Sequence, residues 1–478
     1  MSDQELEVQR HGMMNLASTT TITLIGFLAT IFYAHWVGPG VLGTYLLFLS
    51  IYSILSLFTD LGINYASTQR ISEGKDQDFF YSAGFAMRIG LFLLLTCGLV
   101  IFRDRFADLN EAGLFWVLVG VLGLGTIQSC ISMAIGASNR QGLAATTSLI
   151  NNVVRILVQI ISVFLGYQVY GLIGGLVAGL FVQMVIDARF VDYHLKKFRW
   201  SHVNSLVSFS SWAVLITVGA VLFDNISLII IAYYLPVSEV GIYGVCWTFS
   251  FFALFISTAL VNTLYVKVSR WNARKDQGAI ALSLTRATTY SLIFALPILA
   301  GGILTGHTIL YYAYGASFAT GATALVIIIA TRVIQSVLNL YSTFLMATDH
   351  TKHAVAGIAA GMSVNIVLCL ILVPLMGIAG AAVASCINVI INIVIARMYL
   401  SRLIPLAIEK TSIWHIILAT LIMTVSLLLL GLLMTQSMLQ TIMMILIGAT
   451  IYFLVLLKLN KQIRDDAFRT FKISWIPK

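Results

Sequence analysis

The chain has 478 residues, of which 59% are hydrophobic and only 10% are Asp, Glu, Lys or Arg, and its formal net charge is +9. A soluble domain of this length could not bury so much apolar surface, so the composition excludes a soluble globular protein. Apolar runs of about 20 residues, each long enough for a helix to cross the hydrocarbon core of a bilayer, recur from Met13 to Leu459. The sequence therefore predicts an all-α polytopic membrane protein.

These runs predict about 14 membrane-spanning helices. In chain order they lie near residues 13–35, 42–67, 81–102, 114–137, 143–167, 170–191, 206–232, 241–265, 280–304, 322–346, 354–375, 379–400, 413–435 and 438–459. Three glycines of the sixth span and two of the eleventh are spaced four apart, which is typical of close helix packing. They are Gly171, Gly175 and Gly179, and Gly357 and Gly361.

The lysine and arginine residues support this count of spans. Of the 28, we place four inside the bilayer and 22 at the termini, in loops that follow an even-numbered span, or at the span ends that border those loops. Only Arg103 and Arg105 lie on the other side of the membrane. Because Lys and Arg are enriched in cytoplasmic loops, both termini are predicted to be cytoplasmic.

The net charge of +9 has the same explanation, since the cationic loops and the tail from Lys458 to Lys478 face an anionic cytoplasmic leaflet. No single soluble face gathers this charge, which disfavours nucleic-acid binding. All five cysteines fall inside predicted spans, and none has the spacing of a metal pair. We therefore expect no metal and no cofactor.

A weak internal repeat divides the chain. Residues 34–45 resemble residues 232–243 at an offset of 198 residues. The same offset relates two further pairs of polar residues: Asn64 with Asn262, and Arg88 with Arg286. Spans 1–6 and 7–12 are therefore predicted to form two six-helix lobes, related by a pseudo-symmetry axis along the membrane normal.

Spans 13 and 14 have no counterpart in this repeat. The predicted domains are accordingly an N-terminal lobe at residues 1–200, a C-terminal lobe at 201–405, and an additional helix pair with a basic cytoplasmic tail at 406–478. Transporters often bind their substrate between two such lobes and rock one lobe against the other.

Several classes of enzyme are disfavoured. The sequence contains no Walker-type phosphate loop, no His-Glu-x-x-His pair and no Gly-x-Ser-x-Gly elbow. The outer connections are short, and the longest runs from Arg103 to Gly113. A membrane polymerase or ligase of glycans, which would need a sizeable external catalytic loop, therefore has no candidate site, and we predict that the protein is not an enzyme.

Ionisable residues inside membrane spans usually face a bundle interior or a water-filled cavity, so they are candidate functional residues. The four arginines of this kind are Arg88, Arg155, Arg286 and Arg332. They outnumber the buried acids, which suggests a cationic cavity suited to a diphosphate group. As alternatives, Arg88 and Arg286 extend to the cytoplasmic interface, and Arg155 and Arg332 bond to a neighbouring carbonyl.

Two acids and three asparagines complete the candidate site. Asp60 and Asp224 could bind a proton or Na⁺ and couple transport to an ion gradient, or could instead pair with one of the arginines. Asn64, Asn262 and Asn152 could contact sugar hydroxyls or form hydrogen bonds between helices. Asp187 lies close to the membrane edge, where we expect a solvated helix end.

Several segments resemble a known family when taken together. They are residues 36–45 (Trp-Val-Gly-Pro-Gly-Val-Leu-Gly-Thr-Tyr), 60–64 (Asp-Leu-Gly-Ile-Asn), 223–225 (Phe-Asp-Asn), 239–243 (Glu-Val-Gly-Ile-Tyr) and 377–382 (Gly-Ile-Ala-Gly-Ala-Ala). Over essentially its whole length, the chain resembles the Wzx-type polysaccharide-biosynthesis flippases of the multidrug/oligosaccharidyl-lipid/polysaccharide exporter superfamily. The resemblance implies two six-helix lobes around a central cavity and the use of an ion gradient.

The resemblance also implies a function. A flippase of this type moves a polyprenyl-diphosphate-linked oligosaccharide from the cytoplasmic to the outer leaflet, by alternating access, for the assembly of surface polysaccharides such as O-antigen. The alternative is an ion-coupled multidrug exporter of the same fold, which predicts that acids rather than arginines dominate the cavity. We expect a monomer in the plasma membrane that contacts membrane lipids, its lipid-linked substrate and other membrane proteins of polysaccharide assembly.

Overall fold

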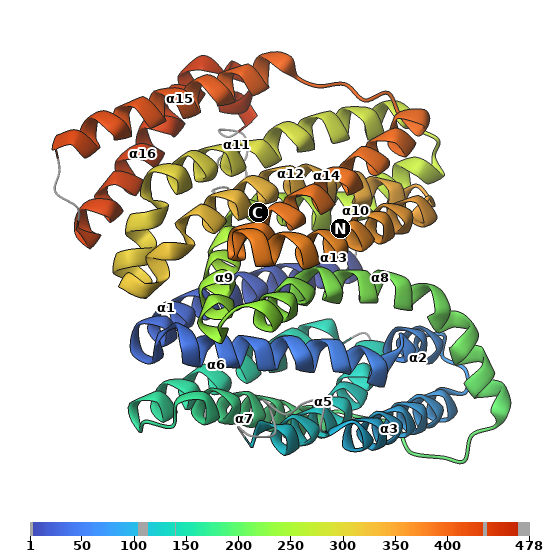
Figure 1. The fold of residues 1–478 in the computed structure, drawn as a ribbon. Helices are drawn as coiled ribbons and strands as arrows, with labels where there is room; N and C mark the ends of the chain where they lie inside the picture. The colour runs from blue at the N-terminus through green and yellow to red at the C-terminus, as the bar shows by residue number, and fades with distance from the viewer. Residues whose placement is uncertain (1–2, 104–112, 139, 434–436, 467–478) are drawn as a thin grey trace. The chain divides into compact units, whose positions relative to one another are not determined.

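The structure is a computed structural model that describes residues 3–103, 113–138, 140–433 and 437–466. Within these ranges all regular secondary structure is helical, as predicted. Among the described residues, thirteen helical segments are long and apolar enough to cross a membrane. Their apolar composition and the helical arrangement drawn in Figure 1 confirm a polytopic membrane protein.

The first two predicted spans lie in one long helical element, which explains why thirteen segments stand against about fourteen predicted. Helix α1 (Asp3–Asp60) is interrupted at Gly38, whose φ of 73° and ψ of 176° are not helical. Glycine adopts positive φ without a steric penalty, and Pro39 lacks the N–H that a continuous helix would use. In Figure 1 the blue chain reverses direction along α1, so that the element has two helical arms.

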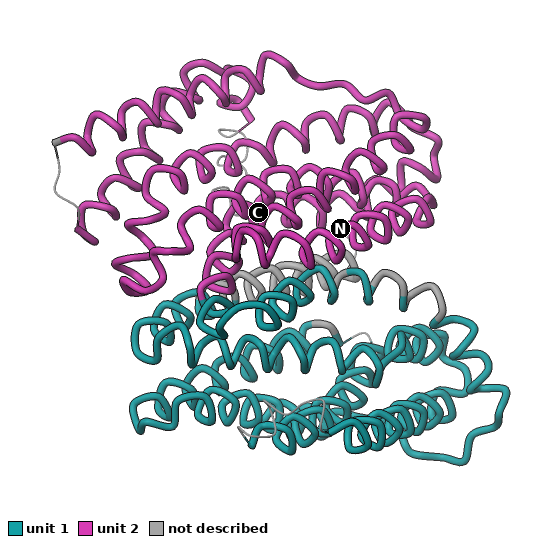
Figure 2. Tube along the Cα trace, viewed as in Figure 1, with its two compact units in different colours: residues 1–241 teal, residues 242–478 magenta. Residues whose placement is uncertain are grey.

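The chain divides into two compact units, residues 1–241 and residues 242–478 (Figure 2). Besides α1, unit 1 contains α2 (Ile63–Ser72), α3 (Gln77–Ile101), α5 (Leu114–Ala137), α6 (Gln141–Phe164), α7 (Gln168–Ala188) and α8 (Trp200–Tyr234). The predicted lobe boundaries after residues 200 and 405 come from the internal sequence repeat, whereas the division at residue 241 comes from contacts in the structure. The predicted boundaries therefore stay predictions.

Small residues bring the helices of unit 1 close together. A Cβ atom on Gly175 of α7 would lie 2.6 Å from the Arg155 carbonyl oxygen of α6, and one on Gly179 would lie 2.8 Å from the Asn151 carbonyl oxygen. Neither position has room for a side chain. The close helix packing predicted from the glycine spacing is therefore confirmed for these helices.

Unit 2 contains most of α9 (Val237–Ser250), which begins in unit 1. The other helices of unit 2 are α10 (Phe255–Ala273), α11 (Gln277–Ile309), α12 (Ala322–Ala347), α13 (Thr351–Met376), α14 (Ile378–Leu403), α15 (Lys410–Leu433) and α16 (Met438–Leu459). Three short helical turns interrupt the series: η2 (Phe251–Leu254), η3 (Leu310–Tyr314) and η4 (Ala316–Gly321).

The helix pair α15–α16 packs against α11 through a buried apolar cluster. Its members include Ile293 of α11, Met423 and Leu427 of α15, and Tyr452 of α16. The Tyr452 hydroxyl donates a hydrogen bond of 2.6 Å to the carbonyl oxygen of Ile293. The helix pair that has no counterpart in the sequence repeat is therefore an integral part of unit 2.

Candidate functional site

A polar cavity of about 320 Å³ lies inside unit 1, between α1, α2, α3, α5 and α8. It brings together three of the residues predicted from sequence, namely Asp60, Asn64 and Arg88. The rest of its wall combines apolar side chains with the polar groups of Tyr52, Ser56, Thr59, Thr126, Gln128, Ser129 and Thr217. This density of polar groups within membrane-spanning helices is typical of a functional cavity.

A sharp turn between α1 and α2 places Asp60 at the cavity wall. Leu61 and Gly62 both adopt left-handed backbone conformations, with φ of 42° and 74°. A Cβ atom on Gly62 would lie 2.9 Å from the Ser210 carbonyl oxygen, so this position requires glycine for both its backbone and its surroundings. After the turn, the backbone N–H of Asn64 donates to Asp60 Oδ1 at 3.0 Å, which anchors the carboxylate at the start of α2.

Arg88 of α3 is turned into the unit and is only 3% exposed. Its Nη1 donates to Ser129 Oγ at 2.8 Å, and its Nε lies 3.5 Å from Asp60 Oδ1. Asn64 Nδ2 donates to the same Ser129 hydroxyl at 3.2 Å. Arg88 is thus held by an ion pair and a serine of α5.

Ser129 was not among the predicted residues, although it joins Arg88 and Asn64. Gln128 and Thr126, which also line the cavity, lie on the same helix. A cluster of small polar residues in an otherwise apolar span, here within residues 126–132, was the signal in the sequence that could have found them.

Asp187 corrects one expectation drawn from sequence. The prediction of a solvated helix end was wrong, because this side chain on α7 is only 1% exposed. Its Oδ2 accepts a hydrogen bond of 2.7 Å from Ser132 Oγ, and Ser132 in turn accepts one of 2.7 Å from Gln128 Nε2. Packing of α7 against α5 buries the carboxylate, which distance from the membrane edge could not reveal.

A second polar cluster in unit 1 lies on α6. Arg155 is half-buried, and its Nη2 donates to Asn152 Oδ1 at 2.6 Å. One turn further on, the Gln159 side chain accepts a hydrogen bond of 2.8 Å from the Tyr33 hydroxyl and donates one of 2.9 Å to the Tyr45 hydroxyl. Arg155 and Asn152 are therefore neighbours, as their spacing on a helix predicts.

Arg332 has internal partners in unit 2. It lies on α12 and is 1% exposed, and its guanidinium carbon lies over the rings of Trp247 and Phe251, at 3.9 and 4.5 Å from their centroids. Its Nε donates to Ser250 Oγ at 3.0 Å. The predicted contact between Arg332 and a diphosphate stays a prediction.

The other three predicted residues are exposed. Arg286 of α11 and Asn262 of α10 lie on the surface of unit 2, and Asp224 of α8 lies on that of unit 1. In the sequence repeat, Arg286 corresponds to Arg88, which is buried, and Asn262 corresponds to Asn64, which is half-buried. Positions that are equivalent in the sequence repeat therefore have different surroundings.

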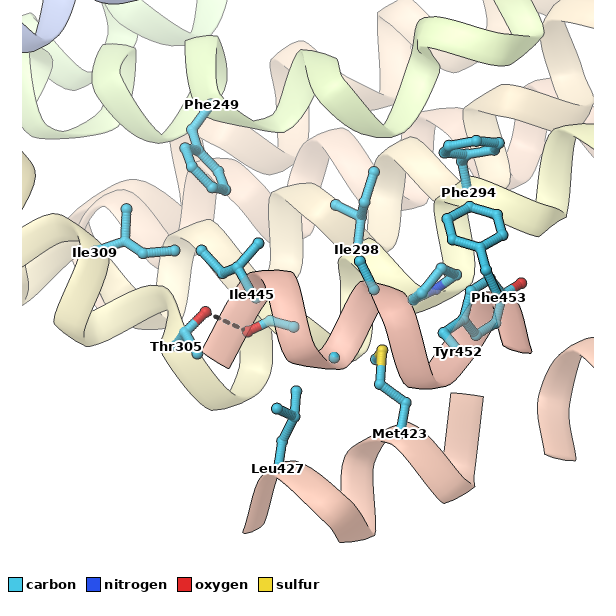
Figure 3. A pocket seen from close by; sticks show the side chains of 15 residues that line it. Phe249, Phe294, Ile298, Thr305, Ile309, Met423, Leu427, Ile445, Tyr452 and Phe453 are labelled. Atoms are coloured by element: carbon cyan, nitrogen blue, oxygen red, sulfur yellow. Dashed lines mark hydrogen bonds between the residues drawn. The ribbon is translucent and has the colours of Figure 1, made fainter. Parts of the chain in front are cut away.

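An apolar groove of about 250 Å³ lies inside unit 2, between α9, α11, α15 and α16 (Figure 3). Its wall includes Phe249, Phe294, Pro297, Ile298, Gly301, Thr305, Ile309, Met423, Leu427, Ile445, Tyr452 and Phe453. The side chains in Figure 3 are almost all hydrocarbon, and the hydroxyl of Thr305 is occupied by a hydrogen bond of 2.8 Å to the Gly301 carbonyl. Such a surface suits a hydrocarbon chain.

A second pocket of about 230 Å³ adjoins this groove, and the two share Thr305 and Leu427. Its wall adds the polar side chains of Thr308, Ser437, Gln440 and Thr441. From Phe294 to Thr308 along α11, the two pockets extend over about 21 Å at 1.5 Å per residue. This is about two thirds of the thickness of a bilayer's hydrocarbon core.

Comparison with known proteins places the chain in a family. The profile of the family described as "Polysaccharide biosynthesis protein" matches residues 33–323. Two proteins of Haloferax volcanii are similar over nearly their whole length. The "Probable low-salt glycan biosynthesis flippase Agl15" is 25% identical over 93% of this chain and 94% of its own. The "Probable flippase AglR" is 23% identical over 96% and 97%.

Among solved structures, "Lipid II flippase MurJ, inward closed conformation" superposes with a TM-score of 0.77 at 17% identity, over 93% of this chain and 98% of that one. At this identity the likeness concerns the fold alone. The predicted all-α fold of a polytopic membrane protein is thereby confirmed. Together with the family match, these findings show a transporter rather than an enzyme, and the chain belongs to the polysaccharide biosynthesis family of multi-pass membrane flippases.

Proposed function

We propose that this protein flips a polyprenyl-diphosphate-linked oligosaccharide from the cytoplasmic to the outer leaflet by alternating access. The observation that carries the proposal is that a chain of a flippase family holds both a polar cavity with a buried arginine and a long apolar groove. A lipid-linked oligosaccharide has the matching parts, a charged and hydroxylated head and a hydrocarbon tail.

The head would bind at the polar cavity of unit 1. Arg88 is paired there with a single carboxylate at 3.5 Å, a long distance for a charge-assisted hydrogen bond. A diphosphate offers more negative charge and several oxygens in a geometry that suits the guanidinium fork. We therefore propose that the diphosphate displaces Asp60 from Arg88, and that Asn64 contacts the head beside it.

Asp60 would then supply the coupling to an ion gradient. Once separated from Arg88, its carboxylate lies in a polar cavity within the membrane and would bind H⁺ or Na⁺. Release of that ion would restore the pair with Arg88 and favour departure of the substrate. Asp224 is the second acid proposed for coupling, and its exposure on α8 leaves it accessible to ions.

Further contacts with the head are assigned to the remaining predicted residues. Arg155 and Asn152 form a half-buried pair on α6 that offers a cation and an amide. Arg286 and Asn262 offer the same chemistry on the surface of unit 2. The hydrocarbon tail would lie in the apolar groove, where Phe294 and Phe453 supply broad apolar surfaces.

The test is transport of a diphosphate-linked oligosaccharide lipid in proteoliposomes, measured as the appearance of glycan in the opposite leaflet. Arg88→Gln should slow transport by about 30-fold, since a charge-assisted hydrogen bond contributes about 2 kcal/mol. Arg274→Gln is the matched control, because Arg274 is an exposed cation that lies outside both pockets, and it should transport at the normal rate.

Three other outcomes would contradict parts of the proposal. Normal transport by Arg88→Gln would remove the polar cavity from the path of the head. Transport that needs no H⁺ or Na⁺ gradient in the unaltered protein would remove Asp60 and Asp224 from coupling. Efflux of cationic dyes, without any flipping of the lipid, would replace the proposed function with that of a multidrug exporter.

A further inference from the structure

The eighth predicted span is broken in the structure. Helix α9 ends at Ser250, the 3₁₀ turn η2 occupies Phe251–Leu254, and α10 begins at Phe255. Two serines bond back to carbonyls at this break: Ser250 Oγ donates to the Trp247 carbonyl at 2.6 Å, and Ser257 Oγ donates to that of Leu254 at 2.9 Å. A 3₁₀ stretch inside a long helix often marks a hinge.

Arg332 of α12 clamps this break. Its Nε donates to the Ser250 hydroxyl at 3.0 Å, and its Nη1 donates to Gln335 Oε1 at 2.6 Å. The guanidinium carbon lies 3.9 Å from the centroid of the Trp247 ring and 4.5 Å from that of Phe251. A cation held against two aromatic faces is attracted to both. Residues on both sides of the end of α9 are thus fixed by one side chain.

Phe249 connects the clamp to the apolar groove. It directly precedes Ser250, and its ring points into the groove from α9 (Figure 3). The ring also packs edge-on against that of Phe252 in η2, with 5.9 Å between centroids. Phe249 is therefore bonded to Ser250, whose side chain Arg332 holds, and packs against Phe252 of the adjoining turn.

We propose that Arg332 is a positioning residue, which holds Phe249 as a wall of the apolar groove and thereby sets how tightly the hydrocarbon tail is held. The inference rests on the proposed function, in which the tail lies in this groove. It differs from the prediction that Arg332 binds the diphosphate, because a positioning residue acts on the tail and leaves contacts with the head unchanged.

The test uses two substrates that share one diphosphate-oligosaccharide head and differ only in the carrier, undecaprenyl or farnesyl. Arg332→Gln should raise KM for the undecaprenyl substrate about tenfold, because the long tail loses apolar contact, and should change KM for the farnesyl substrate less than about twofold. Phe249→Ala should reproduce this split while leaving the clamp intact. Arg332→Lys keeps a cation near the rings but loses the planar fork, and should be intermediate.

Ile303→Ala is the matched control, because Ile303 lies on α11 beside the groove, is 59% exposed and lines neither pocket. It should leave both KM values unchanged. Equal losses on the two substrates would show direct contact with the head and overturn the inference, and so would no loss on either. Melting temperatures of the purified variants show whether they are folded, and Arg332→Lys keeps the inference testable if Arg332→Gln is not.

Failure of the proposed function has a separate signature. If the unaltered protein flips neither substrate, photolabelling of the groove by a diazirine-bearing undecaprenyl monophosphate tests the positioning alone. Labelling of α15 and α16 that is lost in Arg332→Gln and in Phe249→Ala would support the role of Arg332. Labelling that is unchanged in both variants would overturn it.

Discussion

Arg88 and Asp60 illustrate at the scale of single residues how this membrane protein keeps charges inside its helices. An isolated ion in such a place is strongly unfavourable, and a partner offsets part of the desolvation. The two members of this ion pair are not equally buried, because the side chain of Asp60 is 23% exposed and that of Arg88 is 4% exposed. One member is therefore accessible to a ligand or ion and the other is held by the protein.

A double-mutant cycle tests this pairing. Asp60→Asn should lower the free energy of unfolding by about 2 kcal/mol, below the full 3–5 kcal/mol of an entirely buried pair, since Asp60 is partly solvated. Adding Arg88→Gln should recover part of that loss, because the uncompensated cation is then removed. Chemical denaturation in detergent micelles measures both changes, and strictly additive losses would show that the two side chains do not interact.

At the scale of helices, two glycines of the sequence repeat meet in the structure. Gly43 and Gly241 occupy equivalent positions, 198 residues apart. A Cβ atom added to Gly43 would overlap the Val237 carbonyl oxygen and lie 3.0 Å from the Gly241 backbone nitrogen, and one added to Gly241 would overlap the Pro39 carbonyl oxygen. The second arm of α1 and the start of α9 therefore approach until their backbones touch.

Alanine at either position should push these helices apart. We expect Gly43→Ala and Gly241→Ala each to lower the melting temperature of the purified protein by several degrees, because neither carbonyl is on a flexible side chain that can move aside. Gly120→Ala is the control, since a Cβ atom there meets nothing within 4 Å. Variants that melt like the unaltered protein would mean that this contact is dispensable.

The segment between α7 and α8, residues 189–199 of unit 1, is bonded to the helices beside it. Asp78 accepts a hydrogen bond of 3.1 Å from the His194 backbone and lies 2.6 Å from Lys196 Nζ, while the Lys196 backbone donates to Ser82 Oγ at 2.7 Å. The Tyr193 hydroxyl lies 3.2 Å from that of Ser138. These contacts fix the segment against α3 and the end of α5.

Loss of the Asp78 carboxylate should release this segment. We expect Asp78→Ala to increase the rate of trypsin cleavage after Lys196 and Lys197 several-fold, since proteolysis follows local opening. Glu73→Gln removes a similar charge from an exposed pair with Arg70 and should leave the rate unchanged. Equal cleavage rates in both variants would show that the ties to Asp78 contribute little.

At the scale of the whole molecule, the distribution of Lys and Arg predicts that both termini are cytoplasmic. Green fluorescent protein fused to either end should therefore fluoresce in a bacterial host, and alkaline phosphatase fused to either end should be inactive. Phosphatase placed after Arg103, in a predicted outer loop, should be active. An active phosphatase at one terminus and not at the other would require an odd number of spans.

Much of the fold was predictable from the sequence because a bilayer imposes a strong and simple constraint. A span must be apolar over a length set by the hydrocarbon core, and cations gather on one side, so spans and membrane character follow from composition and order alone. The repeat was visible for a similar reason, because duplicated helices keep small and aromatic residues in register. Residues 126–132, by contrast, form a visible cluster of polar residues in an apolar span, but the cluster does not say which side chains they contact.

Only the tertiary structure decided which of these residues meet. The sequence by itself determined that Arg88, Asp60 and Asn64 are polar groups in apolar surroundings. The packing of α1, α2, α3 and α5 brought Arg88 and Asn64 to one serine and Asp60 to Arg88. Arg88 and Arg286 are equivalent in the repeat, yet one is buried and the other exposed. The physical reason is that burial and pairing depend on which helix faces pack together. The residues of one helix define its own polar and apolar faces, but they do not specify which neighbouring residues those faces meet.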